Sequence, residues 1–266
     1  MNSIPKVSVV IPAYNAENYI SAAIGSVLHQ SFKDFEVLVV NDCSTDNTRV
    51  VVENFAISDR RVFLINLPVN NRAPARPRNI GVQQARARWI AFLDADDIWH
   101  PSKLQRQLNL IDKTGARFCS TQMVNFVDSK NLQLFDAQPD EYEFVSFLSQ
   151  LIKNKTPTSS VLVEKTLIER YPFNESIDYS AREDYDCWLH CHEEIGRSVK
   201  ISQRMVGYRI SSSQLSEHKL IMLKRHLHVL WNYRFMTNKR LTIFAFIFTI
   251  SHFIFAIYYR FIKKGL

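Results

Sequence analysis

The most constraining feature of this sequence is the alternation, over its first 110 residues, of short apolar runs with longer segments of helical spacing. The apolar runs are rich in β-branched and aromatic side chains, which is typical of parallel strands that are covered on both faces. They occupy residues 7–11, 35–40, 62–66 and 89–93. Helical segments are expected at residues 17–29, 47–57, 75–87 and 101–110. This order predicts an α/β fold with a mostly parallel, Rossmann-like sheet that is flanked by helices.

The second half of the chain is less regular. We expect strands at residues 118–127, 158–163, 199–202 and 205–210, and helices at 141–151, 184–194 and 217–235. With 266 residues, 46% of them hydrophobic, the chain is long enough for one large domain with an appendage. We therefore predict a catalytic domain over residues 1–215 and a helical tail over residues 216–266.

Acidic side chains follow two of the predicted strands. Asp94, Asp96 and Asp97 come directly after the fourth strand, and Asp42 follows the second. In parallel sheets, ligands bind outside the carboxyl ends of the strands. Carboxylates there can hold a divalent metal through oxygen, and Asp42 can accept a hydrogen bond from a base or a ribose. The alternatives are an acidic loop that caps the next helix and, at Asp42, an Asx-turn.

Four motifs in the first 110 residues resemble those of family 2 glycosyltransferases. They are SVVIPAYN at residues 8–15, SVLHQSF at 26–32 before the strand FEVLVV, RNIG at 78–81, and FLDADD at 92–97. Their order and spacing match the family over residues 6–110, and a weaker resemblance continues to about residue 215. The resemblance implies a GT-A type fold, a nucleoside diphosphate sugar as donor (a UDP-sugar first among them), and inversion at the anomeric carbon.

The resemblance also implies roles for individual residues around the donor. Contacts with the nucleotide would come from Pro12, Tyr14, Asp42, Arg78, Asn79 and Asp94. Asp96 would bind Mn²⁺ or Mg²⁺. One departure concerns the loop after the second strand, where the family typically has Asp-Asp-Gly-Ser and this chain has Asn-Asp-Cys-Ser at residues 41–44. The exact turn is therefore open, but Asp42 is retained.

A second acidic group opens the predicted helix at residues 184–194. A carboxylate at a helix N-terminus is held ionised by the helix dipole and can accept the proton of an attacking hydroxyl. The family has a Glu-Asp pair here, and the resemblance assigns the base to Asp184, with Glu183 and Asp186 in reserve. The alternative is helix capping without catalysis.

Two further groups carry weaker signals. Arg209 resembles a late family motif and could contact the diphosphate, but Ser211 stands where the family often has His, and an edge strand with a solvated Arg is an equal alternative. A zinc site is conceivable at Cys187, Cys191 and the neighbouring histidines 190 and 192. Structural zinc takes ligands from at least two segments, so we favour buried thiols.

The tail is basic and apolar. Residues 219–266 contain nine Lys or Arg and no Asp or Glu, whereas the preceding 218 residues carry 24 basic and 26 acidic side chains. Residues 241–259 are nineteen uncharged residues, about 28 Å as a helix. That length just spans a bilayer core, but a helix in the interface and a buried dimer contact remain open. We expect residues 219–266 to meet a membrane surface, and no nucleic acid.

Together these features predict an inverting glycosyltransferase at the cytoplasmic face of the inner membrane, either peripheral or anchored by a single helix. We expect no secretory signal from residues 1–6, and four cysteines are too few for a disulfide framework in a chain of this length. A lipid-linked glycan in surface polysaccharide or lipopolysaccharide synthesis is the expected acceptor. The alternatives are a membrane-tethered nucleotide-binding protein without catalysis and a nucleotidyltransferase. The latter is disfavoured because residues 12–15 lack a Gly-rich, basic loop.

Overall fold

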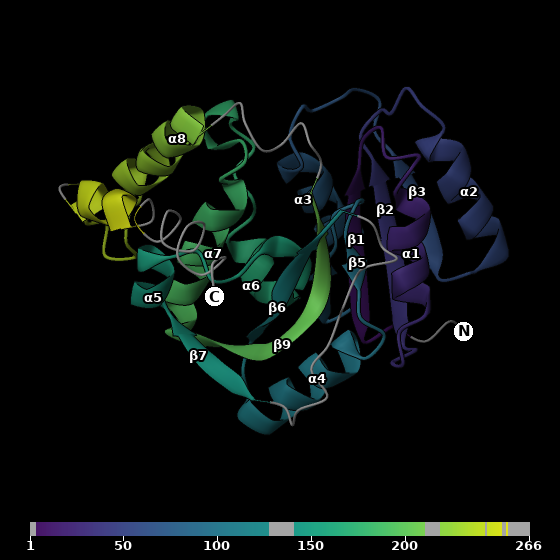
Figure 1. Cartoon of the computed structure of the whole chain (residues 1–266), viewed down its shortest axis with the longest axis horizontal. Coiled ribbons are helices and arrows are strands. Elements are labelled where there is room, and N and C mark those ends of the chain that lie inside the picture. Colours follow the sequence, from purple (N-terminus) through teal and green to yellow (C-terminus); the bar gives the residue numbers. More distant parts are fainter. Residues whose placement is uncertain (1–3, 128–140, 211–218, 243, 252–253, 255–266) are drawn as a thin grey trace.

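A single mixed sheet with helices on both faces forms the centre of the molecule (Figure 1). The structure, a computed structural model, describes residues 4–127, 141–210, 219–242, 244–251 and 254. The strands run in the order β3-β2-β1-β4-β8-β6-β9-β5, and β7 pairs with β9. The first four are parallel to one another: β1 (Val7–Ala13), β2 (Phe35–Asn41), β3 (Val62–Asn66) and β4 (Trp89–Phe92). They confirm the four strands that the apolar runs predict.

The predicted helices of the first half are also present. They are α1 (Ile20–Leu28), α2 (Thr48–Ser58), α3 (Ala75–Gln84) and α4 (Lys103–Thr114). The α4 helix ends at Gly115, whose φ of 68° is the left-handed conformation that glycine adopts without steric cost. The α/β fold class is therefore confirmed.

The other strands give the sheet its mixed character. They are β5 (Ile98–Trp99), β6 (Phe118–Phe126), β7 (Tyr142–Ser146), β8 (Leu162–Glu164) and β9 (Arg197–Arg209). β8 is antiparallel to both β4 and β6, whereas β6 and β9 are parallel. The two strands expected at residues 199–202 and 205–210 are one strand, because β9 continues past a register shift opposite residues 121–123 of β6.

The helix expected at residues 141–151 is a strand followed by a helix. β7 lies along β9, and α5 (Phe147–Ile152) begins only after Ser146, whose side chain accepts a hydrogen bond from the backbone N–H of Ser149. Residues 142–146 therefore form a strand rather than a helix because they pair with β9. The chain next forms a 3-10 turn, η2 (Thr158–Ser160), in place of the start of the strand expected at residues 158–163. Two short elements were not expected from the sequence, α6 (Lys165–Arg170) and η3 (Ile177–Tyr179).

The apolar runs are unbroken because both faces of the sheet are buried. Along β1, Val7, Val9 and Ile11 face a core that they share with α1, whereas Val10 faces a second core with α3. The second core also contains Trp188, from α7 (Glu183–Ile195). In this way the sheet positions α3 and α7 on the same face.

The C-terminal segment packs against the second half of the domain. α8 (Lys219–Asn232) and the helical residues 244–251 share a third core with α5 and α7. Its members are Leu151, Tyr185, Leu189, Val229, Leu230, Tyr233, Leu241 and Ala245. Among the described residues, no helix is long and apolar enough to cross a bilayer, and part of the predicted apolar segment 241–259 lies outside them. The domain boundary at residue 215 lies outside them too and stays a prediction.

Gly81 gives a test of the contact between α3 and β1. A Cβ atom added there would overlap the side chain of Val10, which is fully buried. We expect Gly81→Ala to lower the free energy of unfolding by about 1–3 kcal/mol, because a tightly packed core must shift to admit the methyl group. The measurement is urea unfolding followed by circular dichroism.

Gly25, in α1, is the matched control. No atom lies within 4 Å of a Cβ added at Gly25. We expect Gly25→Ala to raise the free energy of unfolding by up to about 1 kcal/mol, because alanine is the better helix former. Equal effects of the two substitutions would contradict the close approach of α3 to β1.

Candidate functional site

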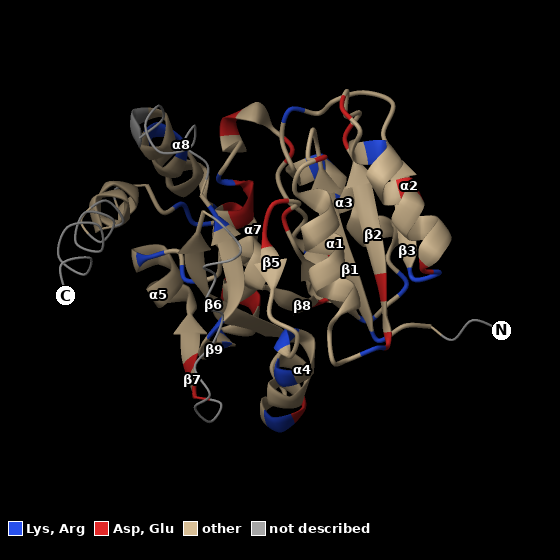
Figure 2. Cartoon of the chain, turned by 45° about the vertical axis from the view of Figure 1, so that its right-hand side comes forward, with Lys and Arg blue, Asp and Glu red and all other residues tan. Residues whose placement is uncertain are grey.

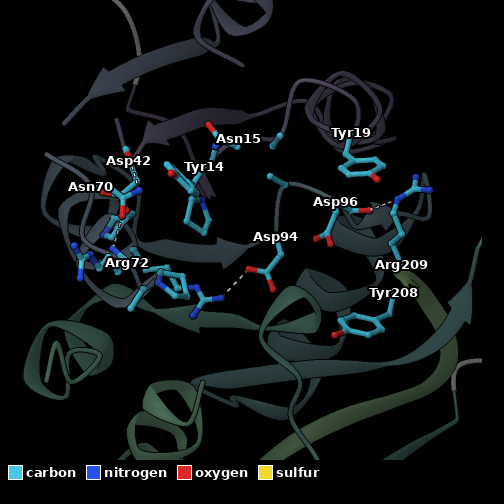
Figure 3. Close-up of a pocket in the computed structure, with 18 residues that line it drawn as sticks. Tyr14, Asn15, Tyr19, Asp42, Asn70, Arg72, Asp94, Asp96, Tyr208 and Arg209 are labelled. Carbon is cyan, nitrogen blue, oxygen red and sulfur yellow. Dashed lines mark hydrogen bonds and ion pairs between the residues drawn. The ribbon is translucent and has the colours of Figure 1, made fainter. Parts of the chain in front are cut away.

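A pocket of about 800 Å³ lies at the carboxyl ends of β1, β2 and β4 (Figure 3). This is the edge at which parallel α/β sheets bind ligands, and the volume is in the range of small-molecule sites. Seven of the residues predicted from the sequence line it: Pro12, Tyr14, Asp42, Arg78, Asp94, Asp96 and Arg209. The structure therefore brings together side chains that are spread over almost 200 positions of the sequence.

Asp42 is held at one end of the pocket by the loop after β3. Its carboxylate accepts hydrogen bonds from the backbone and side-chain N–H groups of Asn71, and the Asn70 side chain donates to its backbone carbonyl (3.1 Å). Asn70 and Arg72 line the pocket themselves. This loop was missed from the sequence. Its signal is the pair of asparagines that follows the third predicted strand at the same sheet edge.

The unusual turn at residues 41–44 has a physical explanation. The Asn41 carboxamide donates to Asn66 (2.8 Å) and accepts from the backbone N–H of Ser44 (3.2 Å), which closes the turn. Cys43 adopts a φ of 58°, the left-handed region in which glycine is the usual residue. The turn therefore keeps a glycine-like backbone despite the cysteine, and Asp42 still faces the pocket.

The buried guanidinium of Arg78 joins three elements. From α3 it donates one hydrogen bond to the Asp94 carboxylate after β4 (2.7 Å) and one to the Glu183 carboxylate at the start of α7 (3.0 Å). The side chains of Arg78 and Glu183 are only 5% and 3% exposed. Burial acts to lower the pKa of Arg78, but the charges of Asp94 and Glu183 outweigh it and raise that pKa. Arg78 is therefore a permanent cation between two carboxylates.

Glu183 depends on this cation to be buried. Burial raises the pKa of its carboxyl group, the Arg78 charge opposes that shift, and the neighbouring Asp184 adds to it. Without Arg78, a carboxylate in this position would be almost fully desolvated and unpaired. The contact therefore fixes where α7 begins relative to the pocket.

The acidic loop after β4 separates its three carboxylates. Asp94 and Asp96 project toward the pocket, whereas Asp97 is 1% exposed and accepts a hydrogen bond from the backbone N–H of Arg209 (3.1 Å). Burial, followed by the Asp94 charge, raises the pKa of Asp96 and raises that of Asp97 to about 8. A cation beside Asp94 and Asp96 would relieve this repulsion.

Arg209 supports that loop. Its Nε donates to the backbone carbonyl of Asp96 (3.1 Å), and its guanidinium lies between the rings of Tyr19 and Phe126, 4.8 and 4.5 Å from their centroids. Tyr19 and Tyr208, two further lining residues, were also missed from the sequence. Contact of Arg209 with a diphosphate stays a prediction.

Asp184 lies in the first turn of α7 and is not among the residues that line the pocket. Its carboxylate accepts hydrogen bonds from the Thr158 hydroxyl (3.0 Å) and the backbone N–H of Tyr185 (2.7 Å). Burial raises the pKa of Tyr208, which lines the pocket, to about 12, and the Asp184 charge contributes to that shift. Asp184 is therefore electrostatically coupled to the pocket and to Arg78, although it does not line the cavity of this structure.

Asp186 occupies a different environment from Asp184. Burial raises the pKa of Asp186 to about 7, and its carboxylate is 3.9 Å from His190 Nε2. The Asp186 charge contributes to raising the pKa values of Tyr179 and Tyr233, which lie beside α8 and at its end. His190 in turn stacks on Tyr233, with ring centroids 4.5 Å apart, so Asp186 lies next to the C-terminal segment.

Asn79 and the cysteine–histidine segment of α7 make local contacts. The Asn79 carboxamide donates to the backbone carbonyl of Phe173 (2.9 Å) and accepts from its N–H (3.0 Å), and it does not line the pocket. Its predicted contact with the nucleotide stays a prediction. Cys187 and Cys191 are buried, and the two ring nitrogens of His192 contact Trp188 O and Ser198 Oγ.

The sequence pattern of one family matches most of the domain that carries this site. Residues 8–169 match the family described as "Glycosyl transferase family 2". The chain belongs to that family. It is therefore a glycosyltransferase, and not a nucleotidyltransferase.

Three similar proteins illustrate the relationship. An Escherichia coli relative, the UDP-Glc:alpha-D-GlcNAc-diphosphoundecaprenol beta-1,3-glucosyltransferase WfgD, is 34% identical over 85% of this chain and 86% of its own length. The crystal structure of S. aureus TarS residues 1–349 with UDP has a TM-score of 0.68 at 22% identity, over 97% of this chain and 73% of that one. The Pyrobaculum calidifontis mannosyltransferase PcManGT, in complex with GDP-Man and Mn²⁺, has a TM-score of 0.61 at 17% identity over 85% of this chain and 62% of that one. These structures confirm the predicted GT-A fold.

Removal of Arg78 tests its role in this glycosyltransferase. We expect Arg78→Gln to lower the free energy of unfolding by about 3–5 kcal/mol, because it leaves Glu183 buried and unpaired. The double substitution Arg78→Gln with Glu183→Gln should lower the free energy of unfolding by less, because no unpaired Glu183 carboxylate then remains buried. The measurement is chemical unfolding of all three proteins.

Arg88→Gln is the control for loss of an arginine–glutamate pair. The Arg88 side chain is 71% exposed and contacts Glu164 at 3.1 Å, so its loss should cost no more than about 1 kcal/mol. If Arg78→Gln lowered the free energy of unfolding by no more than Arg88→Gln does, the Arg78 bridge would not hold α7 to the pocket.

Proposed function

We propose that this glycosyltransferase moves a sugar from a UDP-sugar to a hydroxyl of an undecaprenyl-diphosphate-linked glycan, with inversion, in the synthesis of a bacterial surface polysaccharide. The observation that carries the proposal is the Arg78 bridge. It ties Asp94, in the donor pocket, to the helix that begins with Glu183 and Asp184. A donor-binding group and a candidate base are thereby held in fixed relation, as direct displacement requires.

The nucleoside would occupy the end of the pocket formed by Pro12, Tyr14 and Asp42. The Tyr14 side chain is exposed at the cavity and offers an aromatic face to a base. The Asp42 carboxylate has capacity beyond its bonds to Asn71, because an ionised carboxylate has about four acceptor positions. The diphosphate would then reach the carboxylates after β4.

Asp94 and Asp96 fit a divalent cation of the Mn²⁺ or Mg²⁺ type. Among the described residues, no group of three or more His, Cys, Asp or Glu is arranged to hold a metal ion by itself. Two pocket carboxylates are nonetheless the donor set of sites in which substrate phosphates and water complete the coordination. A bound cation would neutralise charge on the departing diphosphate. The complex of PcManGT with GDP-Man and Mn²⁺ supports this assignment.

Asp184 is the proposed general base. Asp184 lies in the first turn of α7, and the Thr158 hydroxyl orients its carboxylate. In the reaction, Asp184 accepts the proton of the acceptor hydroxyl while the oxygen attacks the anomeric carbon and the bond to UDP breaks. Attack opposite the leaving group inverts the anomeric configuration. Arg78, already paired with Asp94, adds positive charge where the diphosphate leaves.

The acceptor assignment rests on the relative WfgD, whose name gives GlcNAc-diphosphoundecaprenol as acceptor and UDP-Glc as donor. At 34% identity over 85% of the chain, we extend the lipid-linked class of acceptor to this protein without fixing the sugar. Such an acceptor places the reaction at the cytoplasmic face of the inner membrane, where UDP-sugars are available.

Substitution of Asp184 tests the proposal. UDP-glucose, UDP-GlcNAc, UDP-galactose and GDP-mannose are each offered with a synthetic GlcNAc-diphospholipid. We expect the wild type to use one of the UDP-sugars and not GDP-mannose. Asp184→Asn should lower kcat about 10²- to 10⁴-fold, the contribution of a positioned base, and leave the Kd for UDP nearly unchanged. The measurements are product formation by mass spectrometry and calorimetric UDP binding.

Asp186→Asn is the control, because Asp186 is two residues away on the same helix and lies next to the C-terminal segment. We expect it to keep kcat close to the wild-type value. An unchanged kcat in Asp184→Asn would contradict the assignment of Asp184 as the general base. Transfer from a GDP-sugar and from no UDP-sugar would overturn the donor assignment.

A further inference from the structure

The C-terminal segment has an apolar face that the rest of the domain does not cover. Residues 244–251 form a helix with side chains buried on one side, at Ala245 and Thr249. On its other side Phe244, Phe246, Ile247 and Ile250 are 50–58% exposed. Six of the eight residues in this helix are apolar, and a helix that is apolar on most of its surface normally lies in an apolar environment. On its exposed side, no apolar surface of the described residues covers these side chains.

This face continues onto α8. The Trp231 side chain is 44% exposed, and its ring meets that of Phe246 edge to face, with centroids 5.6 Å apart. Figure 1 shows the two helical segments side by side at one end of the molecule. We call Trp231, Phe244, Phe246, Ile247 and Ile250 the C-terminal apolar patch. A continuous exposed patch of this kind marks a surface that binds another apolar phase.

Charge identifies the partner of the patch. The segment between α8 and the second helix carries the exposed Arg234, Lys239 and Arg240, and α8 adds the exposed Lys224 (Figure 2, in which Lys and Arg are blue). From residue 219 to the end of the chain the sequence has no Asp or Glu. In a twofold dimer through this patch, the same basic residues would face each other and repel. An anionic lipid surface satisfies both the apolar and the basic side chains.

The patch is also tied to the catalytic helix. The ring of Tyr179, in η3 just before α7, contacts His228 on α8 (5.4 Å between centroids). The Tyr233 hydroxyl donates to Glu193 on α7 (2.6 Å). A surface that holds α8 therefore also fixes α7, whose first turn carries Asp184.

We infer that the C-terminal apolar patch inserts into the interface of an anionic bilayer, with Arg234, Lys239 and Arg240 on the lipid phosphates, as a peripheral attachment. Binding of this kind needs neither donor nor acceptor, so it is independent of the proposed function. Its consequence for that function is that α7 is held near the headgroups, where the diphosphate of a lipid-linked acceptor would lie.

Vesicle flotation tests the inference. The full chain should float with vesicles of phosphatidylethanolamine and phosphatidylglycerol and much less with vesicles of phosphatidylcholine alone. Lys239→Gln with Arg240→Gln should weaken partition into the anionic vesicles roughly 30-fold, from about 1 kcal/mol per basic residue. Ile247→Ser with Ile250→Ser should weaken it about tenfold or more, because two apolar side chains no longer enter the lipid.

Val50→Ser with Ile57→Ser is the matched control, since both side chains are exposed aliphatics on α2. These substitutions should leave flotation unchanged, and all variants should keep the melting temperature of the wild type. The inference is overturned by equal binding to neutral and anionic vesicles, by loss of binding in the α2 control, or by no flotation of the wild type. It is equally overturned by a dimer in solution that Ile247→Ser with Ile250→Ser dissociates, because the patch would then be covered by a second copy.

Discussion

The pairing of the buried Arg78 guanidinium with two carboxylates is the interaction on which the site depends. Asp94 begins the acidic loop after β4, and Glu183 begins α7, so one side chain on α3 connects three elements. A buried arginine is tolerated only with such partners, and each partner needs the arginine in turn. The position of Asp184 relative to the pocket follows from this mutual requirement.

The sheet supplies the frame in which that pairing can form. Its first four strands are parallel and buried on both faces, so their carboxyl ends open on one edge and their loops converge there. The antiparallel β8 then continues the sheet next to β4, and the 3-10 turn before it brings Ser159 to the backbone N–H of Asp94 (3.0 Å) and Thr158 to Asp184. The acidic loop and α7 thus both contact this turn.

The sequence predicted the parallel half of this fold because local signals agree with tertiary structure there. Unbroken apolar runs identify strands buried on both faces, and helical spacing identifies the segments between them. Residues 141–151 differ, because half of the segment forms β7 only through pairing with β9, more than 50 positions later in the chain. In the site, too, the features that have a local sequence signal could be predicted, and those that depend on long-range contacts could not. Asp94 and Asp96 could be predicted from one short motif, whereas the contact of Arg78 with Glu183 joins residues 105 positions apart and has no local signal.

We propose that the pocket carboxylates and Arg78 form a metal-assisted site for UDP. The most direct test is a calorimetric titration of the protein with UDP, with and without Mn²⁺, repeated with Asp96→Asn and with GDP in place of UDP. We expect Mn²⁺ to tighten the binding of UDP, Asp96→Asn to remove most of this gain, and GDP to bind more weakly than UDP. A gain from Mn²⁺ that Asp96→Asn leaves intact, or binding of GDP as tight as that of UDP, would contradict this proposal.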